Sequence, residues 1–300
     1  MKESVGMIMI FWNSDSNLLA TGLPLKAISK LLAKSSSDAE LEQSLEKLGT
    51  KYLTRYLIIR EYRTLVEKGL QKLPIIPIIV GIPGAGKTTI AKELSTALNI
   101  GLVIGGDALR STLRSIIPKD DNEVLHSSVY DTWKFFGDYT EENLISGYKS
   151  QANIMNSSIQ KMIADRGLRD GESMIVEYLH FLPTQIHSDL LAHPSIIPII
   201  LHISDKELLK NRIKLRTKYS HLRNSGERLI TEIDKYFQIQ EYLCSEATKH
   251  KLQIVNVNDF VEGFESILDY VLKRIKSLNE MKDYTKQIKL IDEIINEHKA

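Results

Sequence analysis

Short apolar runs alternate with longer helical patterns along most of the chain. The run at 75–80 is almost purely β-branched, as expected of a strand buried on both faces of a parallel sheet. Runs at 102–104, 174–177, 196–202 and 253–257 predict four more strands. Strands that alternate with helices indicate an α/β fold, here a doubly wound parallel sheet of about five strands.

The first 70 residues have a different pattern. Helical periodicity covers 25–33 and resumes after the serines that precede Asp38, which are good helix N-caps. Gly49 predicts a break in this second helical stretch, and Gly69 predicts its end. We therefore expect a small, mainly helical appendage at 1–70, followed by a main domain at 71–300.

The two ends of the chain each give one further expectation. The apolar run at 5–12 predicts a strand, because it is too short to span a bilayer and lacks the flanks of a signal peptide. From residue 260 to the end the pattern is helical with one apolar face. With no candidate membrane span, the sequence predicts a cytoplasmic protein.

Composition narrows the class of protein further. The chain has 300 residues, of which 43% are hydrophobic, enough for a full core. Its formal net charge of +1 does not favour broad nucleic-acid binding, which needs a basic face. The single cysteine excludes a disulfide scaffold. The oligomeric state stays open, and a homo-oligomer is compatible with the sequence.

The segment from Gly81 to Thr88 reads Gly-Ile-Pro-Gly-Ala-Gly-Lys-Thr, between a predicted buried strand and a predicted helix. This is the phosphate-binding loop of P-loop proteins in its expected context. Lys87 should reach the β- and γ-phosphates of ATP, and the hydroxyl of Thr88 should bind Mg²⁺. The residues expected to bind nucleotide are Gly81, Pro83, Gly84, Ala85, Gly86, Lys87, Thr88 and Thr89.

A P-loop alone does not distinguish a kinase from a GTPase or a motor. The fifth predicted strand is followed by Asn256-Val257-Asn258, without the Asn-Lys-x-Asp motif that reads guanine. The third ends in Glu177-Tyr178 rather than in adjacent acids, which argues weakly against a motor. A nucleotide-binding regulatory NTPase remains the alternative to a kinase.

Charged residues after the second strand predict an acceptor site. Asp107 should face the γ-phosphate, because ligands bind at the carboxyl ends of parallel strands. It could orient or deprotonate the attacking hydroxyl, or simply cap the following helix. Arg110 and Arg114 share a helix face beside it and suit the anionic groups of an acceptor.

Two arginines after the fourth strand predict a lid. Arg212 and Arg216 are four residues apart on a predicted helix, where a lid arginine would stabilise charge on the transferring phosphoryl group. The stretch at 217–227 is rich in Ser, Asn, Gly and basic residues, as a mobile lid would be. Surface arginines are the alternative interpretation.

Further acceptor-binding candidates lie at the end of the third strand and in the predicted helical region beyond Pro118. Glu177 ends that strand and could hold Mg²⁺ through water or orient the acceptor, and His180 follows it. His126, Ser127 and Ser128 could bind acceptor oxygens, although helix capping explains the serines equally well. The remaining histidines lack metal-ligand spacing.

These residues together resemble the archaeal 2-phosphoglycerate kinase family over roughly 72–275. The resemblance is carried by Val103-Ile104 with Asp107, Arg110 and Arg114, by Leu125-His126-Ser127-Ser128 with Tyr130 and Trp133, by Glu177 with His180, by Ile203-Ser204-Asp205, by Arg212 with Arg216, and by Tyr236 to Leu243. It implies transfer of phosphate from ATP to a hydroxyl of a small, already phosphorylated carboxylic acid. Residues 1–70 stand where the family carries an ATP-cone-like domain, here degenerate.

The chain departs from the family pattern around the expected acceptor site. The second strand of the family usually ends Ser-Thr-Asp, and here it ends Gly105-Gly106-Asp107. Its third strand usually ends Glu-Gly-x-His, and here Tyr178 replaces the glycine. These changes favour an acceptor other than 2-phosphoglycerate. The family includes mevalonate 3-phosphate 5-kinases of isoprenoid synthesis, so we expect mevalonate 3-phosphate, with 2-phosphoglycerate as the alternative.

Overall fold

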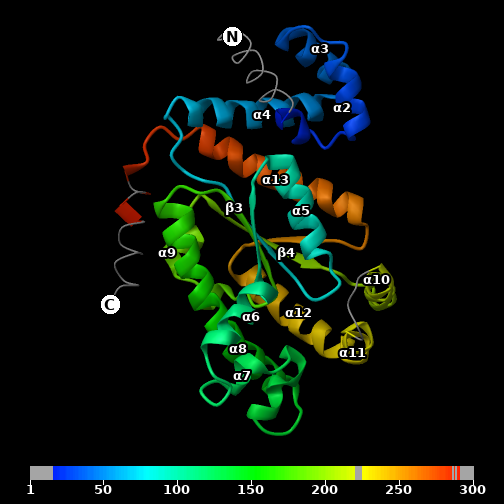
Figure 1. Ribbon diagram of the computed structural model, residues 1–300, viewed down its shortest axis with the longest axis vertical. Helices are drawn as coiled ribbons and strands as arrows, with labels where there is room; N and C mark the ends of the chain where they lie inside the picture. The colour runs from blue at the N-terminus through cyan, green and yellow to red at the C-terminus, as the bar shows by residue number, and fades with distance from the viewer. Residues whose placement is uncertain (1–15, 220–224, 286, 288, 291–300) are drawn as a thin grey trace.

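The computed structural model describes residues 16–219, 225–285, 287, 289 and 290, with only the backbone described at 216–219 and 225. The strand predicted at 5–12 and the last part of the predicted C-terminal helix lie outside these residues. The described chain forms a sheet covered by helices, with further helices stacked at one end (Figure 1).

The sheet has five strands, all parallel, in the order β2-β3-β1-β4-β5. The strands are β1 (Ile76–Val80), β2 (Leu102–Gly105), β3 (Met174–Tyr178), β4 (Ile196–His202) and β5 (Gln253–Asn256). Every residue of the central strand β1 is buried, which explains its unbroken apolar run. The predicted parallel α/β fold is confirmed.

Helical segments connect the strands. They are α5 (Lys87–Leu98), α6 (Gly106–Ile116), α7 (Glu123–His126), the 3₁₀ helix η1 (Val129–Phe135), α8 (Glu141–Met162), the π-helical η2 (Ile163–Arg169), the 3₁₀ helix η3 (Pro183–Gln185), α9 (Ser188–Ala192), α10 (Lys206–Tyr219), α11 (Ser225–Thr231), α12 (Ile233–Lys249) and α13 (Phe260–Asn279). The chain moves outward from β1 to β2 and then back across the sheet, and such crossovers are right-handed. The connections therefore cover both faces, as in a doubly wound fold.

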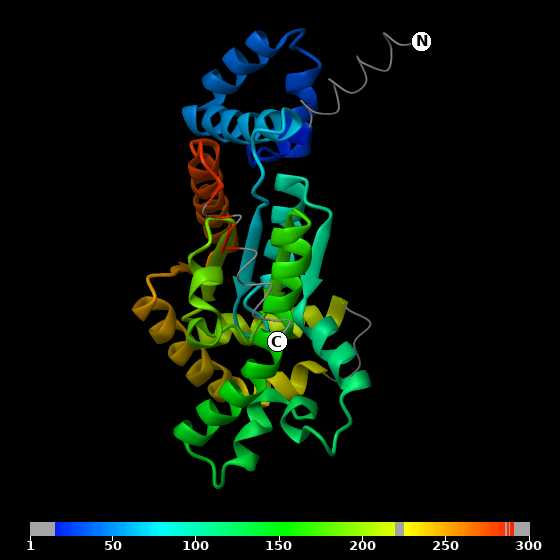
Figure 2. The ribbon, with the colours of Figure 1, turned by 90° about the vertical axis from the view of Figure 1, so that its left-hand side faces the viewer.

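The N-terminal helices are α2 (Leu25–Leu32), α3 (Asp38–Leu48) and α4 (Thr50–Glu67), which confirms a helical appendage. Gly49, with φ of 146°, separates α3 from α4 as predicted, because this backbone conformation favours glycine. The helices enclose a small core that includes Leu45 and Tyr56. They lie at the end of the molecule opposite α6, α7 and α11 (Figures 1 and 2).

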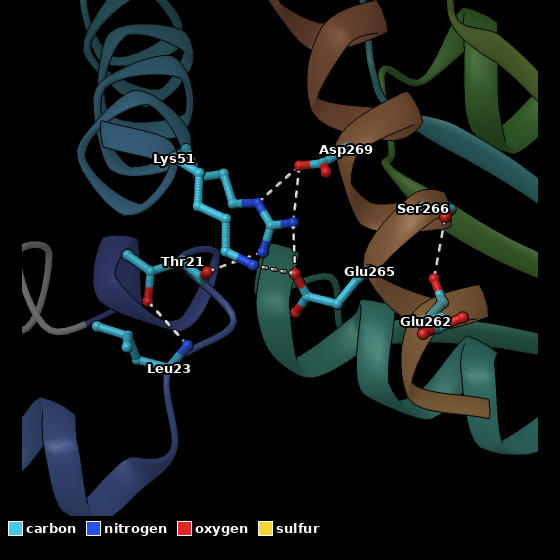
Figure 3. A network of polar contacts seen from close by, with 8 residues as sticks. Thr21, Leu23, Lys51, Glu262, Glu265, Ser266 and Asp269 are labelled. Atoms are coloured by element: carbon cyan, nitrogen blue, oxygen red, sulfur yellow. Dashed lines mark hydrogen bonds and ion pairs between the residues drawn. The ribbon is translucent and has the colours of Figure 1, made fainter. Parts of the chain in front are cut away.

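An ionic network joins the N-terminal helices to α13. Arg55 of α4 is 2% exposed, and its guanidinium donates to Thr21 O at 2.9 Å, Glu265 at 2.8 Å and Asp269 at 2.7 Å. Lys51 adds a second ion pair to Glu265 (Figure 3). Because α13 also packs on β4 and β5, this network ties the appendage to the main sheet.

Candidate active site

The P-loop runs from the end of β1 to the start of α5, and two of its glycines have positive φ angles. Gly84 has φ of 86° and Gly86 of 99°. A Cβ atom at Gly84 would also lie 2.6 Å from Leu209 Cδ1, so glycine is required there for both conformation and space. The loop thus wraps closely under α10, with its backbone free to approach phosphate.

Lys87 and Thr88 begin α5 at the inner side of the loop. Lys87 Nζ donates to Ile82 O at 3.2 Å, across the P-loop. Its ammonium group therefore lies at the loop that is expected to bind phosphate. The Thr88 hydroxyl donates to Glu177 Oε1 at 3.1 Å, so a hydroxyl and a carboxylate meet at the carboxyl ends of β1 and β3. Two adjacent oxygens fit Mg²⁺, which takes few protein ligands and completes its shell with water and phosphate.

A cavity of 420 Å³ opens beside the P-loop. It is lined by Pro83, Lys87, Thr88, Asp107, Arg110, Ser128, Val129, Tyr130, Glu177, Tyr178, Leu179, His180, Ile213, Gly226, Arg228, Leu229 and Tyr236. The walls come from β3, α5, α6, η1, α10, α11 and α12, so the structure gathers residues from most of the main domain. Eight of the predicted site residues line this cavity: Pro83, Lys87, Thr88, Asp107, Arg110, Ser128, Glu177 and His180.

Asp107 lies in the first turn of α6, exposed on the cavity wall. The N-cap of α6 is Gly105, and no side chain caps this helix. The alternative interpretation of Asp107 as a mere helix cap therefore does not hold. Its carboxylate interacts electrostatically with Arg110 and Arg114, the two arginines further along the same helix.

Arg110 and Arg114 both donate to backbone carbonyls at the C-terminal end of α7. Arg114 donates to Leu125 O at 2.9 Å and to Ser127 O at 3.1 Å, and Arg110 donates to the same two carbonyls. Burial and the neighbouring Arg114 lower the pKa of Arg110 to about 10, so it remains a cation at neutral pH. Only Arg110 lines the cavity; Arg114 supports this end of α7, and its predicted contact with the acceptor stays a prediction.

The segment His126 to Ser128 contributes backbone more than side chains. His126 Nε2 lies 2.8 Å from Ile117 O, and this residue does not line the cavity. Ser127 presents its carbonyl to the arginines and to Gln151. Of the three, only Ser128 lines the cavity, and its predicted contact with the acceptor stays a prediction.

Arg212 binds backbone carbonyls behind the P-loop rather than lining the cavity. Its Nη2 donates to Val257 O at 2.7 Å and Asn258 O at 2.9 Å, which fixes the turn between β5 and α13. The side chain of Arg216 lies outside the described residues, as does part of the predicted lid. A role for either arginine on the transferring phosphoryl group stays a prediction.

Several cavity residues were not predicted. Arg228 of α11 brings a cation to the cavity just past the stretch predicted to form a lid. Tyr130 and Tyr236 pack edge to face, with ring centroids 5.8 Å apart. Behind the cavity wall, Gln151 is buried on α8 and contacts His180 without lining the cavity itself. The buried face of α8 also carries Asn156 and Gln160, and these three amides among apolar residues of one helix were the signal that could have marked it.

Known proteins place the chain in a family. A family model described as an AAA domain matches residues 78–231. The chain is similar to mevalonate-3-phosphate 5-kinase of Thermoplasma acidophilum, 32% identical over 65% of this chain and 94% of that protein. It is similar to 2-phosphoglycerate kinase of Pyrococcus furiosus, 28% identical over 81% and 84%, and of Methanococcus vannielii, 29% identical over 87% of both. The chain belongs to this family of P-loop kinases.

The kinase is therefore an ATP-dependent phosphotransferase with a hydroxyl acceptor. A solved putative kinase from Chloroflexus aurantiacus covers 70% of this chain and 99% of its own, at 16% identity and a TM-score of 0.37. In the part of the present chain that the structure describes, no helix is both long and apolar enough to cross a bilayer.

Proposed function

We propose that this kinase transfers the γ-phosphate of ATP to the 5-hydroxyl of mevalonate 3-phosphate. The observation that carries the proposal is the mixed wall of the cavity. Arg110 and Arg228 offer positive charge to a phosphate and a carboxylate, while Val129, Leu179 and Leu229 form apolar wall. Mevalonate 3-phosphate has a methyl group and three methylene groups to bury, whereas 2-phosphoglycerate has almost no apolar surface. The 32% identity to a relative named for this activity supports the same choice.

The reaction uses residues on facing walls of the cavity. The acceptor oxygen forms a bond to the γ-phosphorus, the bond from that phosphorus to the β–γ bridging oxygen breaks, and ADP leaves. Asp107 lies on the cavity wall and would take the proton of the attacking hydroxyl. Lys87 holds the phosphates. Mg²⁺, held by Thr88 and Glu177, would supply further positive charge when bound.

A second candidate is 2-phosphoglycerate kinase. Relatives of that name match more of this chain than the mevalonate-3-phosphate 5-kinase does, 81% and 87% against 65%. Their substrate is also a phosphorylated acid with one free hydroxyl. The same cations and the same base would serve it.

The deciding experiment offers ATP with mevalonate 3-phosphate, 2-phosphoglycerate or unphosphorylated mevalonate in parallel, and measures ADP release and product mass. We expect kcat/KM to be at least tenfold higher for mevalonate 3-phosphate than for either of the others. Phosphorylation of 2-phosphoglycerate alone would reverse the choice of substrate. ATP turnover that no acid changes would favour a regulatory NTPase instead.

A further inference from the structure

His180 is a buried histidine on the wall of the acceptor cavity. It follows β3, is 4% exposed and stacks on Tyr148, with ring centroids 6.1 Å apart and an interplanar angle of 21°. Its Nε2 lies 2.7 Å from Oε1 of Gln151 on α8. The ring is therefore held on one face by an aromatic ring and at one nitrogen by an amide.

The contacts of Gln151 determine which nitrogen of His180 carries the proton. Gln151 Nε2 donates to Val124 O at 2.6 Å and to Ser127 O at 3.1 Å. Carbonyl oxygens only accept hydrogen bonds, so the amide nitrogen must face them and the amide oxygen must face His180. That oxygen also only accepts. Nε2 of His180 must therefore be the protonated nitrogen.

The surroundings of His180 keep the ring neutral. Its burial and the positive charges of Arg110, Lys87 and Arg114 lower the pKa to about 3. Lys87 faces it from α5 and the two arginines from α6, while α8 contributes the uncharged Tyr148 and Gln151. A neutral ring protonated on Nε2 has an unshared electron pair on Nδ1. Among the described residues Nδ1 has no hydrogen-bond partner, and His180 lines the cavity.

We propose that His180 Nδ1 accepts a hydrogen bond from the hydroxyl group of the acceptor, and that Gln151 is the positioning residue that keeps Nδ1 unprotonated. An electron pair repels carboxylate and phosphate oxygens, whereas the cavity cations Lys87, Arg110 and Arg228 attract them, so Nδ1 selects the one O–H donor of the substrate. The anionic groups then lie toward Arg110 and Arg228, and the hydroxyl lies toward His180 and Asp107. This inference deepens the proposed kinase reaction and rests on it.

Kinetics of two substitutions at one position test the contact with the hydroxyl. His180→Leu removes the acceptor, and we expect kcat/KM for the acid that the wild type phosphorylates to fall by roughly 2- to 13-fold, with KM for ATP within about twofold, since one hydrogen bond contributes about 0.5–1.5 kcal/mol and about 1.4 kcal/mol corresponds to a factor of ten. His180→Asn can place its amide oxygen near the position of Nδ1 and should recover most of that loss. His193→Asn is the matched control, because His193 is equally buried but precedes β4, at the opposite end of the strands.

The protonation of His180 can be measured without catalysis. In ¹⁵N-histidine-labelled protein, we expect the free enzyme to show Nδ1 unprotonated and Nε2 protonated, and the Nδ1 resonance to shift when ADP and the acid are added. Gln151→Glu should raise the pKa of His180, so that kcat/KM falls at a higher pH on the acidic side than in the wild type. Gln151→Met is the neutral companion and should leave the pH profile unchanged.

The outcomes separate this inference from the proposed function. Phosphorylation of neither acid by the wild type would overturn the proposed function. Phosphorylation of one acid, with kcat/KM unchanged in His180→Leu or with Nδ1 protonated in the free enzyme, would overturn the role of His180 alone. The role of His180 would also be contradicted if activity is lost in His180→Leu and not recovered in His180→Asn, and if the Nδ1 resonance does not shift when the acid is added.

Discussion

Gly106 and Tyr178 compete for a single space at the carboxyl ends of β2 and β3. A Cβ atom at Gly106 would lie 2.3 Å from Tyr178 Cβ and 3.1 Å from its Cα. Any side chain at 106 therefore requires glycine at 178. The family pattern has a threonine at the position of Gly106 and a glycine at the position of Tyr178. In this chain the glycine is at the first position and the larger residue at the second. The two departures thus form one compensating exchange, in which the phenol of Tyr178 is buried and donates to Asn156 Oδ1 at 3.1 Å.

This exchange predicts a specific coupling between the two positions. We expect Gly106→Ala to lower the free energy of unfolding by about 1–3 kcal/mol or more, because it overpacks the contact with Tyr178. In a Tyr178→Gly background the added loss should be clearly smaller, because the 2.3 Å contact is gone and only the backbone contacts at 3.1 Å and 3.3 Å remain, although Tyr178→Gly is itself destabilising. Tyr178→Ala is the matched control, since it removes the ring but keeps the clashing Cβ. Urea unfolding of the six proteins measures the coupling, and equal losses in the glycine and alanine backgrounds would refute it.

Asp107 gives a prediction about chemistry rather than stability. Asp107→Asn keeps the shape of the side chain but removes its ability to take a proton, so kcat should fall about 10²–10⁴-fold. KM for ATP should change less than about threefold, because nucleotide binding depends on the P-loop. Asp120→Asn, at an exposed turn, is the control. Steady-state kinetics with both substrates varied give both constants, and an unchanged kcat would remove Asp107 from the proton transfer.

Local patterns predicted the elements well but did not predict the partners of the arginines. The apolar run of β4 and the P-loop spacing fix their strand and helix within a few residues, because both signals are local. Arg212 donates to carbonyls 45 and 46 residues later in the chain, which no local pattern indicates, and its role on phosphate stays a prediction. Arg110 and Arg114 do share a helix face, as their spacing required. That both reach Leu125 O depends on how α7 packs beside α6, which no spacing in the sequence encodes.

The network around Arg55 predicts an asymmetric response to substitution. The side chain of Arg55 is 3% exposed, whereas those of Glu265 and Asp269 are 28% and 60% exposed. The double substitution Glu265→Gln, Asp269→Asn leaves the buried cation of Arg55 without a carboxylate partner. It should lower the free energy of unfolding by about 3–5 kcal/mol. Arg55→Met leaves two carboxylates that water can solvate, so its loss should be smaller.

Urea unfolding of these variants distinguishes a buried ionic link from ordinary surface pairing. Lys51→Ala serves as the control, because Lys51 is half exposed and its pair with Glu265 should contribute less than about 1 kcal/mol. A larger loss in Arg55→Met than in the Glu265→Gln, Asp269→Asn protein would contradict the assignment of the buried charge to the arginine.

Two buried histidines predict that the free energy of unfolding decreases in acid. Burial lowers the pKa of His180 to about 3 and of His193 to about 4, while both return to about 6.5 in the unfolded chain. Between these values the unfolded state binds more protons, so this contribution is complete above about pH 7 and is lost as the pH falls. From pH 7 to pH 5.5, each histidine should cost about 1 kcal/mol of stability. Urea unfolding at both pH values should show a smaller difference in His180→Asn and in His193→Asn, and the smallest in the double variant, because asparagine does not titrate. A double variant with the full wild-type pH dependence would show that other groups govern acid sensitivity.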